Sequence, residues 1–183
     1  IMKKFNSQYA IGIAILLLCV TLIGFRVYNY LTEGLMTTEE IVASVEKTEI
    51  IIDTYQSESY FVLLTAPNKP VKEVNVEIYS SVRFNRYIWF NDADNSSKIF
   101  NHCLYISGNN ALDITYGTKV KGAKGADINF NTGRHRVDLR EKDAYMLVRE
   151  YPWDTTNPVW VESIYFYNKW LEIIEEYVVE SMW

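Results

Sequence analysis

The side chains best suited to catalysis or metal binding are few and unfavourably spaced. The chain has two histidines, His102 and His135, and two cysteines, Cys19 and Cys103. His102 and Cys103 are adjacent, so on a strand they point to opposite faces and cannot share a metal or act as nucleophile and base. We therefore predict a protein without metal or other cofactor, without assigned catalytic residues, and without enzyme activity.

One short segment has part of the spacing of a calcium loop. Asp92, Asp94 and Ser96 occupy its first, third and fifth positions. Such a loop also needs a glycine at the sixth position and an acidic residue at the twelfth. Ser97 and Cys103 stand there instead, so the segment is predicted to be a hairpin turn.

A basic stretch lies in the second half of the chain. It contains Lys119, Lys121, Lys124, Arg134, Arg136, Arg140 and Lys142. On a strand, Arg134, Arg136, Asp138 and Arg140 would share one face, which is either solvated or available to an acidic partner. The formal net charge of the whole chain is -5, which excludes the strongly basic class of nucleic-acid-binding proteins.

These residues belong to a body that follows an apolar segment. From Ala10 to Phe25 the chain has no charged residue and would span about 24 Å as a helix. Because Phe25 and Arg26 follow in place of a small-residue cleavage site, a retained anchor is favoured over a signal peptide or a buried core helix. The predicted lipid contacts of this anchor are Tyr9, Ala10, Leu16, Leu17, Leu18, Phe25, Arg26 and Tyr28.

The charges beside the apolar segment predict its orientation. Lys3 and Lys4 precede it, whereas Glu33, Glu39 and Glu40 follow. The excess of basic residues on the cytoplasmic side of membrane proteins places the N-terminus in the cytoplasm. We therefore expect a single-pass protein with an extracytoplasmic body, in the periplasm or its equivalent.

The body combines a short helical region with many strands. Thr37 and Glu40 have the spacing of a capping box, and apolar residues then recur at helical spacing, which predicts a helix over 38–55. Eight strands are predicted from alternating apolar residues between turn formers. They cover residues 60–66, 71–80, 86–90, 99–107, 111–116, 126–130, 134–140 and 144–151.

The last segment shows a helical apolar stripe formed by Trp160, Ile164, Tyr167, Leu171, Ile174 and Val178. Its apolar arc is wide, so a C-terminal amphipathic helix is expected either to bind a protein partner or to pack wholly on its own sheet. The predicted partner-binding residues are Trp160, Phe166, Trp170, Tyr177 and Trp183.

The predicted fold is mainly β with flanking helices, and it divides into three parts. Residues 1–36 form a cytoplasmic tip, a transmembrane anchor and a linker. Residues 37–157 form an antiparallel sandwich, jelly-roll-like, with a leading helix. Residues 158–183 form the C-terminal helix.

Part of the body resembles a bacterial family of membrane-anchored β-sandwich proteins, the domain of unknown function numbered twelve-fourteen. The likeness covers roughly residues 58–153, and the residues that carry it are Arg86, Trp89, Asp92, Asp94, Leu112, Asp113, Arg149, Tyr151 and Pro152. The family's middle motif is missing at Asn129–Thr132. The resemblance implies a jelly-roll-like sandwich and no established activity.

These observations favour an accessory or structural subunit of a membrane or envelope protein complex. Its expected partners are the lipid bilayer, through the N-terminal helix, and other subunits of that complex. One alternative is an anchored module that binds a glycan or another polar ligand through aromatic rings and the basic strand. Another is a pilin-like filament subunit, although Gly34 and the cap at Thr37 oppose one continuous helix.

Overall fold

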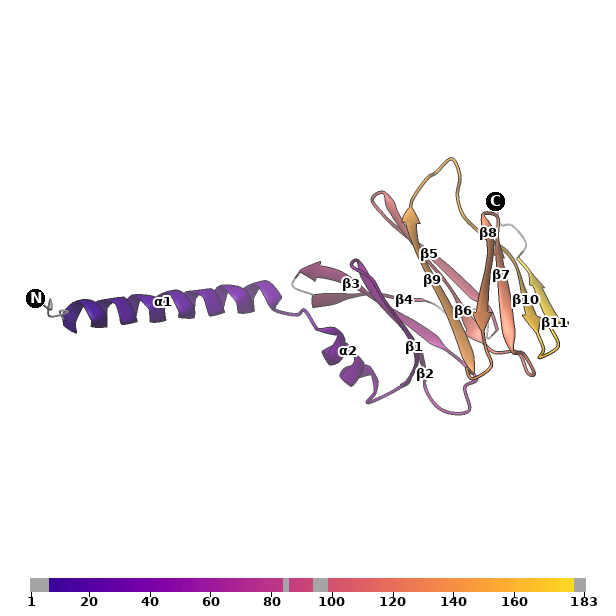
Figure 1. Ribbon diagram of the computed structural model, residues 1–183, viewed down its shortest axis with the longest axis horizontal. Helices are drawn as coiled ribbons and strands as arrows, with labels where there is room; N and C mark the ends of the chain where they lie inside the picture. The colour runs from indigo at the N-terminus through magenta and orange to yellow at the C-terminus, as the bar shows by residue number, and fades with distance from the viewer. Residues whose placement is uncertain (1–6, 84–85, 94–98, 180–183) are drawn as a thin grey trace, which may run out of the picture.

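An exposed apolar helix precedes a body of β-strands in the computed structural model, which describes residues 7–83, 86–93 and 99–179 (Figure 1). Helix α1 covers Ser7–Thr32. Within it, Gly12–Thr32 is long and apolar enough to cross a membrane, and none of it is buried against the body. A signal sequence near an N-terminus has the same properties. The helix is therefore either a membrane anchor or a signal sequence.

A second, short helix begins where the capping box predicts. Helix α2 covers Thr38–Val45. The Thr37 hydroxyl accepts a hydrogen bond from the Glu40 amide at 3.2 Å, and the Glu40 carboxylate accepts one from the Thr37 amide at 2.8 Å. These bonds satisfy two amides that have no partner inside the helix.

The expected extension of this helix to residue 55 is wrong. Strand β1 covers Ile50–Gln56 and pairs with β2. The segment begins with three β-branched isoleucines, which are restricted in a helix and pack well on a pleated sheet. Only Ile41 and Val45 of the predicted apolar stripe are buried on the helix.

The strands form three antiparallel sheets. Sheet A contains, in spatial order, β1, β2 (Tyr60–Ala66), β3 (Asn75–Arg83) and β4 (Arg86–Ala93). Sheet B contains β5 (Asn101–Ser107), β6 (Asn110–Thr118) and β9 (Ala144–Pro152) in the order β5-β6-β9. Sheet C contains β7 (Gly125–Phe130), β8 (Gly133–Asp138), β10 (Val161–Tyr167) and β11 (Ile173–Val178) in the order β11-β10-β7-β8.

The mainly β, antiparallel class and the eight strands predicted between residues 60 and 151 are confirmed. The strands are arranged as a stack of sheets A, B and C. Sheet B is the central layer, because β6 is buried from Ala111 to Thr118, on both of its faces. A strand buried on both faces needs apolar or fully bonded side chains at every position.

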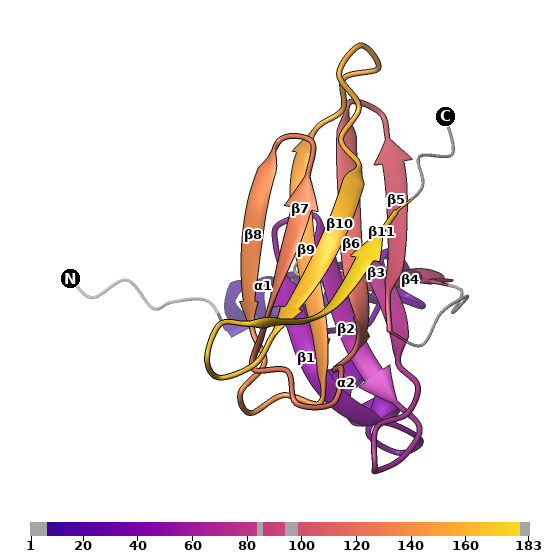
Figure 2. The same ribbon diagram turned by 90° about the vertical axis from the view of Figure 1, so that its right-hand side faces the viewer.

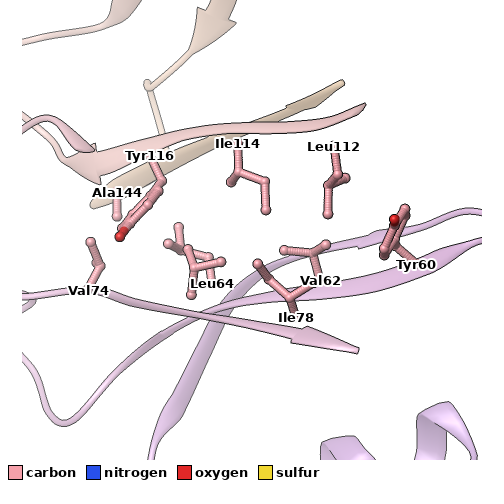
Figure 3. Packing of buried hydrophobic residues seen from close by; sticks show 10 residues of the cluster. Tyr60, Val62, Leu64, Val74, Ile78, Leu112, Ile114, Tyr116 and Ala144 are labelled. Atoms are coloured by element: carbon pink, nitrogen blue, oxygen red, sulfur yellow. The ribbon is translucent and has the colours of Figure 1, made fainter. Parts of the chain in front are cut away.

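Three hydrophobic clusters hold the layers together. The first lies between sheets A and B, where Val62, Leu64 and Ile78 meet Leu112 and Ile114 (Figure 3). The second lies between sheets B and C and includes Ile128, Tyr145, Ile164 and Phe166. The third packs Ile41 and Val45 of α2 on the other face of sheet A, against Phe61, Leu63, Tyr79 and Tyr87. The order through the molecule is therefore α2, sheet A, sheet B, sheet C.

This order separates sheet C from α1. The backbones of Met36 and Tyr87 exchange hydrogen bonds of 2.9 and 2.8 Å, which ties the segment after α1 to sheet A. Sheet C lies at the opposite end of the body from α1 (Figure 1), and in Figure 2 its outer face is turned to the viewer with α1 behind.

The expected C-terminal helix is wrong for the part of it that the structure describes, which ends at Val179. Strands β10 and β11 form a hairpin there, and β10 also pairs with β7. The Asn168 side chain accepts hydrogen bonds from the amides of Trp170 and Glu172, at 2.8 and 3.1 Å, and so closes the turn. Aromatic and β-branched residues dominate both strands, and this composition together with pairing to β7 outweighs the helical spacing.

Candidate functional site

The predicted partner-binding residues that the structure describes differ in their exposure. Phe166 is fully buried in the core, so it cannot contact a partner, and Tyr177 packs on it with ring centroids 6.0 Å apart. Trp160 is partly buried, and Trp170 is 70% exposed. Trp183 lies outside the described residues. The four of these residues that the structure describes therefore do not share a helix face.

A different set of apolar side chains is exposed on this hairpin. Trp170 and Leu171 are each 70% exposed, Val178 is 67% exposed and Ile173 is 55% exposed. We call these four residues the hairpin surface. They lie on the turn and on β11, which is an edge strand of sheet C. Exposed apolar side chains on an edge strand are typical of surfaces that bind another chain.

A second feature is a charged cluster on the outer face of sheet C, centred on Asp127 of β7. Arg136 of β8 lies directly across from Asp127 and donates two hydrogen bonds to its carboxylate, at 2.8 and 3.0 Å. Arg134 forms a further ion pair at 3.2 Å, and the Tyr167 hydroxyl donates a hydrogen bond at 2.6 Å. The predicted basic face of β8 is confirmed for Arg134 and Arg136.

These contacts control the charge state of the cluster. Burial alone raises the pKa of the Asp127 carboxyl, but hydrogen bonds from Arg136 and Tyr167 and the two guanidinium charges outweigh it, so the pKa lies below the ordinary 3.8. Burial, and then the bond to Asp127, raises the pKa of Tyr167. Two arginines face one carboxylate, so the cluster keeps one excess positive charge.

A cavity of about 550 Å³ adjoins this cluster, between the end of β8 and the turn that joins β10 to β11. In Figure 2 that turn reaches toward the lower end of β8. We call the cavity the β8 pocket. Its wall contains apolar groups of Tyr167 and Leu171. It also contains four cationic side chains, Lys124, Arg136, Arg140 and Lys169, and two carboxylates, Asp138 and Glu141.

A third feature is a buried polar cluster between sheets B and C. Asp113 of β6 is 1% exposed and accepts a hydrogen bond from Arg149 of β9 at 2.6 Å. His102 of β5 approaches the same carboxylate at 3.0 Å through Nε2. The Arg149 guanidinium lies 3.3 Å from the ring centroid of Phe130 in sheet C. Asp113, Arg149 and Tyr151, which carry part of the family resemblance, thus lie together.

This cluster contains polar atoms without partners. Within the part of the chain that the structure describes, Arg149 Nε and the Tyr151 hydroxyl are buried and make no hydrogen bond. Burial, and next the charge of Asp113, raises the pKa of Tyr151 to about 12. Apart from the resemblance, no sequence pattern identified this cluster, because it depends on the register of β6 against β9.

The other residues considered for chemistry lie apart. Cys103 packs between sheets A and B, on the face opposite to His102 as predicted, and burial raises the pKa of its thiol to about 12. His135 contacts the edge of Phe130, with ring centroids 5.5 Å apart. In the described ranges no three His, Cys, Asp or Glu side chains gather as a metal site. Asp94, Ser96 and Ser97 lie outside those ranges.

The residues assigned to the anchor lie on α1, away from the body. Leu16, Leu17, Leu18 and Phe25 are 60 to 64% exposed, and Tyr28 is 43% exposed. Arg26 is also exposed. The side chains of Tyr9 and Ala10 lie outside what the structure describes.

Comparison with known proteins adds no relative. No protein-family model, no curated protein and no solved structure matches the chain. The resemblance to the twelve-fourteen family remains a prediction.

Proposed function

We propose that the protein is a single-pass, membrane-anchored accessory subunit of a membrane or envelope complex, with its N-terminus in the cytoplasm and its β body outside. The observation that carries this proposal is the position of the hairpin surface. It lies on sheet C, the layer farthest from α1, where a partner can reach it without meeting the bilayer.

The anchor is the first requirement of this function. Helix α1 has the length and apolar composition of a span, and it makes no buried contact with the body. An apolar helix left uncovered in this way is stable in lipid and costly in water. Lys3 and Lys4 before the span favour the cytoplasmic N-terminus.

The break after α1 favours a globular anchored body over a pilin-like filament subunit. The helix ends at Thr32, and Gly34 takes a φ of 74°, which only glycine adopts freely. A new helix then begins at the capping box. Helices α1 and α2 are therefore separate helical units joined by a turn.

The partner surface is tested with point substitutions. Deleting residues 158–183 would remove core residues such as Ile164 and Phe166, so it would damage the fold. The double substitution of Ile173→Ser and Val178→Ser changes only exposed side chains. It is expected to reduce the size of the complex that the full chain forms in native-membrane extracts, measured by blue native electrophoresis and light scattering.

The matched control is Ile106→Ser on β5, because Ile106 is 50% exposed but lies on another sheet. It should leave the complex intact. A full chain that runs as a monomer before any substitution would refute the role as a subunit. Release of the chain from membranes by alkaline carbonate would refute the anchor.

A further inference from the structure

The β8 pocket has an unusual charge for this protein. The chain as a whole has a formal net charge of -5. The pocket wall nevertheless carries four cationic side chains against two carboxylates. A local excess of cations in a cavity is the electrostatic condition for binding an anion.

Arg136 is held in a fixed position with donors to spare. The Nε and one terminal nitrogen of Arg136 donate hydrogen bonds to the Asp127 carboxylate. A guanidinium group has five N–H donors, so donors remain for a ligand on the pocket side. Arg134 offsets the charge of Asp127, and Arg136 therefore keeps its attraction for an incoming carboxylate.

Two lysines complete the positive side of the pocket. Lys124 and Lys169 are exposed, and neither makes an ion pair among the residues that the structure describes. The Lys169 ammonium lies 4.6 Å from the centroid of the exposed Trp170 ring. Both lysines come from loops that meet at the pocket rather than from the paired strand β8.

The remaining wall limits the kind of anion. Asp138 and Glu141 would repel a phosphate or a polyanion. Arg140 already donates hydrogen bonds to both carboxylate oxygens of Asp138, so Glu141 is the carboxylate that can accept a hydrogen bond from a hydroxyl group. Tyr167 and Leu171 offer apolar surface for the face of a saturated ring. A volume of about 550 Å³ lies within the ordinary range for small-ligand sites.

We propose that the β8 pocket binds an acidic sugar of the hexuronate class, with its carboxylate on Arg136, Lys124 and Lys169 and a hydroxyl on Glu141. This site goes beyond the subunit role and does not depend on a protein partner.

The test uses the full chain in a polyoxyethylene detergent, because the headgroup of a maltoside or glucoside detergent would itself compete. Saturation-transfer difference NMR is recorded with D-glucuronate, and with D-glucose as the neutral match. D-glucuronate is expected to give the stronger signal. Lys124→Gln and Lys169→Gln should each raise its dissociation constant by about three- to tenfold.

Lys72→Gln is the matched control, because Lys72 is an exposed lysine in the loop before β3, away from the pocket. It should bind as the unaltered chain does. Equal signals from D-glucose and D-glucuronate, or affinity unchanged in both pocket variants, would overturn the proposal. Displacement of D-glucuronate by an equimolar amount of inorganic phosphate would show a general anion site and overturn the assignment to a sugar. The Ile173→Ser and Val178→Ser chain should still bind D-glucuronate, which separates this site from the partner surface.

Discussion

Asp113 and Asp127 are surrounded by the same kinds of group in different layers of the molecule. Each lies on a strand directly across from an arginine, Arg149 for Asp113 and Arg136 for Asp127. Each arginine also lies over an aromatic ring. The arginine side chains differ, because Arg149 is 14% exposed between sheets B and C, whereas Arg136 is 56% exposed on the outer face of sheet C.

This difference in hydration separates a structural ion pair from one that can serve a ligand. Between the sheets, each charge has lost its water and depends on its partner. On the outer face, the guanidinium remains hydrated and can exchange water for another anion. The same cross-strand pairing can therefore have two roles, which are decided by the layer in which it lies.

The largest expected effect comes from removing the charge of Asp113. Asp113→Asn leaves the guanidinium of Arg149 buried without a counter-charge, and it is expected to lower the free energy of unfolding by about 3 to 5 kcal/mol. Urea unfolding of the full chain in detergent, followed by near-UV circular dichroism, measures this change.

A compensating variant tests whether the buried charge is the cause. Adding Arg149→Met to Asp113→Asn removes both charges, and it should recover part of the lost free energy of unfolding. If the double variant is less stable than Asp113→Asn alone, the loss comes from packing on Phe130 rather than from the unpaired charge.

The outer carboxylate should matter less. Asp127→Asn is expected to lower the free energy of unfolding by about 2 kcal/mol, because Arg134 and Arg136 stay hydrated when their partner loses its charge. The folded pKa of Asp127 lies below 3.8, so its stabilisation is complete above about pH 5 and is lost as the pH falls through the folded pKa. The difference in the free energy of unfolding between Asp127→Asn and the unaltered chain should thus be constant from pH 7 to about pH 5. Below about pH 5 this difference should decrease.

Urea unfolding at several pH values follows this difference, with Asp138→Asn as the exposed control. Asp138 is paired with Arg140 at the surface, so its loss should change stability little. If Asp113→Asn and Asp127→Asn lower the free energy of unfolding equally, the position of the ion pair in an inner or an outer layer does not decide its contribution to stability.

The sequence predicts local structure well where one signal dominates. Turn formers separate the eight strands between residues 60 and 151, and the capping box marks the start of α2. The prediction from sequence fails over residues 158–179. There the spacing from Trp160 to Val178 fits a helix, whereas the aromatic and β-branched content fits strands. Pairing of β10 with β7 decides the outcome, and no local pattern contains that contact. Asn168 is a turn former between two such runs, and it was a local signal of a hairpin.

The candidate sites show the same limit. The basic face of β8 follows from alternation along one strand, so Arg134 and Arg136 could be placed together from the sequence. Their partner Asp127 could not, because it depends on the register between β7 and β8. Asp113 and Arg149 are farther apart in the chain and meet only through the register of β6 and β9.

The smallest effect should come from two tyrosine hydroxyls, one in each cluster. Tyr167→Phe removes a 2.6 Å hydrogen bond to Asp127 and is expected to lower the free energy of unfolding by about 1 kcal/mol. Tyr151→Phe removes a buried hydroxyl that has no partner among the described residues, so it should leave stability unchanged or slightly higher. The same urea unfolding experiment compares them. A loss for Tyr151→Phe as large as that for Tyr167→Phe would mean that water or a ligand reaches the inner cluster, and the contrast between a buried inner arginine and a hydrated outer arginine would then fail.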